Sequence, residues 1–144
     1  MKPTLQPIIS NIQTIRGVAV LMDSDIAHWY GLETRVLKQA VRRNRDRFPD
    51  DFMFELTENE IELMVSQNVI PNKSILGGAT PFAFTQEGVA MLSGILRSPK
   101  AIAVNIGIMR AFVALRQHAQ NVEVLATELK KLESSTHHRF SEVG

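Results

Sequence analysis

The stretch that decides the fold is "DSDIAHWYGLETRVLKQAVRRNRDRF", residues 23–48, which has the pattern of two helices joined at a glycine. Asp23 or Ser24 is placed to cap the first helix, and Gly31 is placed to end it in a left-handed conformation. The inward face of this helix is expected to consist of Ile26, Ala27 and Tyr30. A small residue, a glycine turn and a second apolar helix together form the pattern of a helix-turn-helix.

The second helix of this unit begins near Glu33 or Thr34 and ends before Pro49, because the residue that precedes a proline avoids helical angles. Its buried stripe is predicted to be Val36, Leu37, Ala40 and Val41. Cations step along the other side at intervals of three, four and three residues, at Arg35, Lys38, Arg42 and Arg45. This spacing predicts one exposed basic row.

The charge of the chain is unevenly distributed. Between residues 35 and 47, six cations stand against Asp46 alone, although the formal net charge of the 144 residues is only +1. A basic patch on an otherwise acidic chain is the pattern expected of a protein that binds a polyanion. The alternative is a solvated helix face that is rich in arginine.

A DNA-binding helix-turn-helix inserts its second helix into the major groove, where early side chains reach base edges. The residues predicted to contact bases are Thr34, Arg35, Lys38 and Gln39, because Arg and Lys pair with guanine and Gln pairs with adenine. The residues predicted to contact phosphates are Arg42, Arg43, Arg45 and Arg47. The expected partner is therefore double-stranded DNA.

The rest of the chain predicts an α+β fold, in which a small antiparallel sheet packs with several helices. Alternating apolar residues at 12–22, 52–56 and 82–85 are typical of strands, and the first run forms a hairpin or a bulged strand at Gly17. Thr57 and Glu60 have capping-box spacing at the start of a helix. A further helix is expected from Thr85 to near Arg97, and a long one from Pro99.

Residues 1–117 are predicted to form this domain, and residues 118–144 a C-terminal helix or tail. Val122, Leu125, Leu129 and Leu132 recur at spacings of three, four and three, like a short coiled-coil stripe. We expect this stripe to form a homodimer, although it could instead lie back on its own domain. A two-fold dimer predicts an inverted-repeat DNA site.

Composition argues against other classes of protein. The chain has no cysteine, and no apolar stretch approaches the length of a membrane span or a signal peptide, so a cytoplasmic protein is expected. No histidine stands at the spacing of a metalloprotease motif. Asp23, Asp25, Asp50 and Asp51 could bind a divalent ion, but capping and turn roles explain them more simply. We therefore expect no catalytic residue, metal, cofactor or small-molecule substrate.

Several motifs resemble those of the ORF6N domain, a relative of the KilA-N and BRO-N domains of phages and large DNA viruses. They are "IRG" at residues 15–17, "WYG" at 29–31, "VRRNRDRFPDDFMFEL" at 41–56, "FTQEGVAML" at 84–92 and "AIAVNIGIMRAF" at 101–112. The resemblance implies a small α+β DNA-binding module, found on prophages and used in transcriptional regulation or as an antirepressor.

The basic helix of that family corresponds here to Arg35, Lys38, Arg42, Arg43, Asn44, Arg45 and Arg47. One departure is the loop after the double glycine, where relatives often carry arginines but this chain has Ala79 and Thr80. Lys73 lies nearby and could replace them. The main alternative function is a protein-protein interaction module, such as an antirepressor that binds a repressor without touching DNA.

Overall fold

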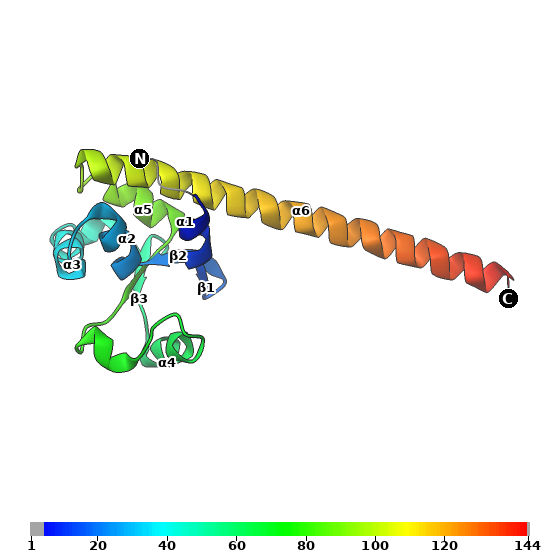
Figure 1. The fold of residues 1–144 in the computed structure, drawn as a ribbon, viewed down its shortest axis with the longest axis horizontal. Coiled ribbons are helices and arrows are strands. Elements are labelled where there is room, and N and C mark those ends of the chain that lie inside the picture. Colours follow the sequence, from blue (N-terminus) through cyan, green and yellow to red (C-terminus); the bar gives the residue numbers. More distant parts are fainter. Residues whose placement is uncertain (1–4, 144) are drawn as a thin grey trace. The chain divides into compact units, whose positions relative to one another are not determined.

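The computed structural model describes the backbone of residues 5–143 and the side chains of residues 7–133. The chain divides into two compact units, Met1–Ala111 and Phe112–Gly144. The first unit contains the sheet and most of the helices (Figure 1). The second unit is the continuation of a single long helix.

A four-stranded antiparallel sheet organises the first unit, with strand order β1-β2-β4-β3. Strands β1 (Gln13–Ile15) and β2 (Val18–Met22) form a hairpin that turns at Arg16 and Gly17, as predicted. Strand β4 (Phe82–Phe84) lies between β2 and β3 (Met53–Glu55). All three residues of β4 are buried, because both faces of this inner strand are covered.

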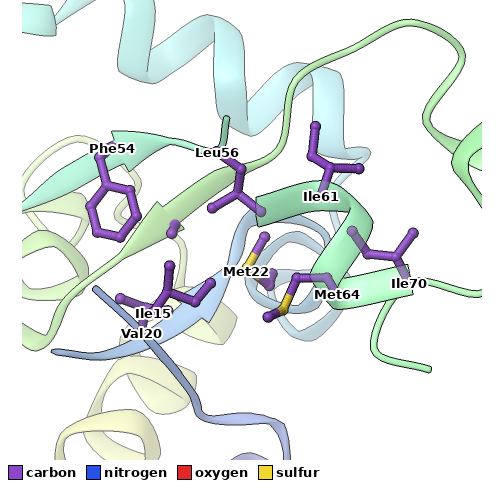
Figure 2. Close-up of a cluster of buried hydrophobic side chains, with 9 residues drawn as sticks. Ile15, Val20, Met22, Phe54, Leu56, Ile61, Met64 and Ile70 are labelled. Atoms are coloured by element: carbon purple, nitrogen blue, oxygen red, sulfur yellow. The ribbon is translucent and has the colours of Figure 1, made fainter. Parts of the chain in front are cut away.

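One face of the sheet is covered by helix α4 (Glu58–Ser66), whose buried Ile61 and Met64 point at the strands. Figure 2 shows these side chains packed with residues from β1, β2 and β3 and with Ile70. The predicted capping box at the start of α4 is confirmed. The Thr57 hydroxyl accepts from the Glu60 N–H at 3.2 Å, and the Glu60 carboxylate accepts from the Thr57 N–H at 2.8 Å.

Two short helices differ from the sequence expectations. Helix α1 (Leu5–Asn11) was not predicted, and its Ile8 is buried. Helix α5 (Gln86–Leu92) starts at its expected cap, Thr85, but ends five residues before Arg97. Within α5, an added Cβ at Gly88 would lie 2.0 Å from the carbonyl oxygen of Phe52, so only glycine allows this helix to approach the chain before β3.

The remaining helices of the first unit are α2 (Asp23–Tyr30), α3 (Thr34–Arg43) and the start of α6 (Pro99–Val143). Helices α2 and α3 pack against each other (Figure 1). The chain also forms two 3-10 turns, η1 (Arg45–Arg47) after α3 and η2 (Lys73–Leu76) after α4. Helix α6 begins as predicted, with Ser98 Oγ accepting from the Ala101 N–H at 3.0 Å. The predicted α+β fold is confirmed.

Candidate nucleic-acid interface

Helices α2 and α3 form the predicted helix-turn-helix unit. Gly31 ends α2 with φ 75°, a conformation that glycine adopts without strain. The Leu32 N–H donates to the Ala27 carbonyl at 2.9 Å, which closes the turn. Ile26, Ala27 and Tyr30 are buried as expected. The Tyr30 hydroxyl donates to Asn105 on α6, and burial raises the pKa of this phenol, so it stays protonated.

The buried side of α3 is narrower than predicted. Leu37 and Val41 are fully buried, whereas Val36 and Ala40 are only half-buried. The third buried residue of this helix is Lys38, with 5% of its surface exposed. The prediction that Lys38 stands in the exposed basic row is therefore wrong.

Three contacts explain the burial of Lys38. Its Nζ donates to the Thr80 carbonyl at 2.5 Å, lies 3.7 Å from Asp23 Oδ2, and lies 4.7 Å from the ring centre of Phe82. A lysine can be buried when its charge is paired and its amine is hydrogen-bonded. Lys38 thus ties α3 to the start of α2 and to the segment that leads into β4, and its amine cannot reach a base edge.

Asp23 is the acidic partner in this arrangement, and it does not cap α2 from outside, because the residue before the helix is Met22. Its carboxylate accepts from the N–H of Ser24 at 2.7 Å and from the N–H of Phe82 at 2.9 Å. Burial raises the pKa of Asp23 above its ordinary value, while these two N–H groups and Lys38 act in the opposite direction. Sequence spacing gave no sign of this contact between residues 23 and 82.

The arginines of the predicted site are exposed, namely Arg35, Arg42, Arg43, Arg45 and Arg47, and so is Gln39. Thr34 and Asn44 are half-buried. Two of the arginines form surface ion pairs: Arg35 Nε lies 2.8 Å from Glu33 Oε2, and Arg45 Nη2 lies 3.6 Å from Glu55 Oε2. Both pairs are largely solvated, and such pairs contribute only ~0 to 1 kcal/mol, so these guanidiniums remain available to another anion.

The end of α3 differs from the prediction. The helix stops at Arg43, six residues before Pro49, because Asn44 leaves helical geometry with φ −124°. The Asn44 side-chain amide donates back to the Ala40 carbonyl at 2.8 Å, which satisfies one of the last acceptors of the helix. Arg45 and Arg47 therefore lie on the 3-10 turn η1 and not on the α-helical row.

A groove of about 730 Å³ lies beside α3. Thr34, Arg35, Lys38 and Arg42 of α3 line it together with residues from three other parts of the chain, within 10–13, 22–25 and 68–81. The guanidinium of Arg42 lies 5.4 Å from the ring centre of Phe82, which holds this side chain near the groove. Lys73, considered as a substitute for the missing loop arginines, is ion-paired with Glu58 at 2.5 Å.

The arrangement suits recognition of an anion. Five exposed guanidiniums gather on α3 and η1, and arginine presents a planar fork that fits phosphate. Among the described residues, no three His, Cys, Asp or Glu side chains come together in a way that could hold a metal ion. The described helices also include none with the length and apolar character needed to cross a bilayer.

The fold and the basic helix define a small α+β protein built around a helix-turn-helix. The family model described as the ORF6N domain matches residues 10–95, more than half of the chain, and the protein belongs to this family. Comparisons with curated proteins and with solved structures found no match.

Proposed function

We propose that this protein binds double-stranded DNA through the exposed arginines of α3 and η1. The observation that carries the proposal is the concentration of five exposed guanidiniums within residues 35–47, where Asp46 is the single acid. Clustered like charges repel each other, and that repulsion is relieved when a polyanion binds. In this role the protein acts in the cytoplasm as a prophage- or mobile-element-type regulator of transcription or as an antirepressor.

The exposed residues divide into two groups by their position on α3. Arg35 and Gln39 are near the start of the helix, and we assign them to base edges in the major groove. The phosphate contacts are assigned to Arg42, Arg43, Arg45 and Arg47, which set affinity and orientation more than sequence preference. Lys38 is excluded from both groups because its amine is buried against Asp23 and Thr80. The proposal involves no catalysis, no cofactor and no small-molecule substrate.

The proposal predicts a strong dependence of binding on salt. If four arginines each neutralise one phosphate, log K falls with log salt at a slope of about −3.6. Replacing Arg42→Glu and Arg43→Glu together should halve this slope to about −1.8 and weaken binding at least tenfold. Fluorescence anisotropy of a labelled duplex, titrated at several salt concentrations, measures both quantities.

The matched control is Lys130→Glu with Lys131→Glu, because it makes the same change in net charge at two adjacent exposed positions of a helix. This control should keep the slope of the unaltered protein when both are titrated at concentrations too low for the chain to self-associate. An affinity that falls equally in both double variants would mean that net charge alone matters. An unchanged slope in the Arg42 and Arg43 variant would show that this patch does not grip phosphate.

A second candidate function is a protein-protein interaction module, such as an antirepressor that contacts a repressor. The observation in its favour is the set of exposed aliphatic side chains at Val122, Leu125, Leu129 and Leu132. This candidate predicts no duplex binding even at low salt, where contacts to phosphate are strongest. The same titration therefore separates the two candidates.

A further inference from the structure

The second unit carries an apolar seam, defined here as Val122, Leu125, Leu129 and Leu132 of α6. These side chains are 50%, 57%, 53% and 64% exposed. Their spacing of three, four and three residues is the a/d spacing of a coiled coil, which is narrower than the stripe a helix buries against a globular core. Four large aliphatic residues in such a row are an uncovered helix face.

The same spacing begins earlier in α6. Four residues at three- and four-residue steps are buried in the first unit, namely Ala101, Val104, Ile108 and Ala111. The repeat continues through Leu115 and His118 and reaches the seam without a change of phase. The seam is thus the continuation, along one helix, of a repeat that is already used for burial.

The residues that flank the seam permit another helix to approach. Ala119 and Ala126 occupy e positions of this repeat and Asn121 occupies a g position, so the flanks are small along most of the stripe; Glu128 and Glu133 occupy the last g and e positions. Charges between residues 122 and 133 are mixed, with three glutamates and two lysines. This segment therefore carries no large charge of one sign that would keep two copies apart.

We propose that the seam binds the same segment of a second copy of this chain, related by a two-fold axis. A strict a/d row is best covered by an equally narrow apolar row on another helix. The seam of a second copy is such a row. Its eleven residues span only about 16 Å of helix, so the dimer is expected to be weak and to depend on protein concentration. The proposal goes beyond DNA binding and does not rest on it.

Sedimentation velocity of the full chain over a hundredfold range of concentration tests the proposal. The unaltered protein should shift from monomer to dimer. Leu125→Gln should weaken the dimer about tenfold or more, whereas Val124→Gln should change the dissociation constant less than about twofold. These neighbours are matched, since Leu125 is 57% and Val124 is 58% exposed, but Val124 lies outside the seam. Circular dichroism checks that both variants stay helical.

Cysteine crosslinking gives a second readout, because the chain contains no cysteine of its own. Single variants Leu125→Cys and Leu129→Cys should form disulfide-linked dimers under mild oxidation if the helices are parallel and in register. Ala126→Cys should do so if they are antiparallel, since this e position then meets its own copy near the axis. Val124→Cys should remain unlinked in either case.

Two outcomes would overturn the proposal: a chain that stays monomeric at every concentration, or a dimer that Leu125→Gln and Val124→Gln weaken equally. Duplex binding is measured on the same variants. A monomer that still binds DNA would contradict the proposed dimer and leave the proposed function intact. A dimer that does not bind DNA would contradict the proposed function and leave the dimer intact.

Discussion

At the scale of single residues, Lys38 shows what sequence periodicity missed. It follows Leu37 and stands three residues before Val41, so its position already lies at the edge of the apolar stripe of α3. The expectation of exposure came from its charge and from its spacing to the arginines. What allows its burial is Asp23, an acid on another helix, and no local pattern shows that contact.

The buried Lys38–Asp23 pair predicts a specific coupling in stability. Lys38→Met keeps the aliphatic stem but leaves the Asp23 carboxylate without its cation, which should cost about 3 kcal/mol of unfolding free energy. Adding Asp23→Asn removes the unpaired charge and keeps an oxygen that can accept from the Phe82 N–H. The double variant should therefore be more stable than the sum of the single changes implies, as urea denaturation of all four proteins would measure.

A comparison with Arg42 tests whether Lys38 takes part in DNA binding. If Lys38 only positions α3, Lys38→Met should leave the salt slope of DNA binding unchanged, whereas Arg42→Met should reduce its magnitude by about 0.9. Additive effects of Lys38→Met and Asp23→Asn on stability would contradict the coupling. A reduced slope for Lys38→Met would contradict the exclusion of Lys38 from the interface.

At the scale of elements, local signals predicted the starts of helices better than their ends. The Thr57 and Ser98 hydroxyls each accept from a backbone N–H three residues later, so the local sequence is sufficient to predict where these two helices start. The end of α3 depends on Asn44 turning back to Ala40, which competes with Pro49 as a stop. Helix α1 was missed because it has only seven residues, too few for a clear period.

The contact between the β1–β2 hairpin and α4 predicts a pH dependence. Arg16 donates from Nε and Nη2 to the two carboxylate oxygens of Glu60, at 2.8 and 2.9 Å. These hydrogen bonds are the main cause that lowers the pKa of Glu60 to about 2. Because the folded pKa is below the ordinary value of 4.5, this contribution to stability is complete above pH 4.5 and is lost as the pH falls towards 2.

Glu60→Gln should remove that acid-induced loss, and thermal unfolding followed between pH 5 and pH 2 would show it as a flatter profile for the variant. The buried Asp23 and the half-buried Asp25 have the opposite sign, since desolvation raises the pKa values of both carboxyl groups and the folded state holds their protons more tightly. Both residues are present in the variant and in the unaltered protein, so their contributions to the pH dependence of stability cancel in the comparison. Parallel profiles would show that Arg16 and Glu60 are not linked in solution.

At the scale of the whole molecule, the strands could be predicted but their order could not. Alternation identified β1, β2, β3 and β4 one by one. The insertion of β4 between β2 and β3 pairs Leu21 with Phe84 and Met53 with the same residue, contacts that span more than thirty positions of sequence. Such pairings depend on packing across the finished core, and no local pattern encodes them.

The two units should differ in local stability. Residues 101–111 of α6 include buried side chains, whereas every described side chain from 116 to 133 is exposed. Isolated helices gain little stability without tertiary packing. Amide hydrogen exchange at low protein concentration should therefore be fast in residues 118–133 and slow in 101–111, as mass spectrometry of peptic fragments would report. Equal protection of both segments in a dilute monomer would contradict this difference.

The burial of Lys38 has a chemical consequence for the surface that α3 and η1 present. Every exposed cation on these two elements is a guanidinium, which keeps its proton at any cellular pH. Acetylation acts on primary amines, and the one amine of this segment is shielded. The positive charge that α3 and η1 present therefore does not depend on an amine that lysine acylation could neutralise.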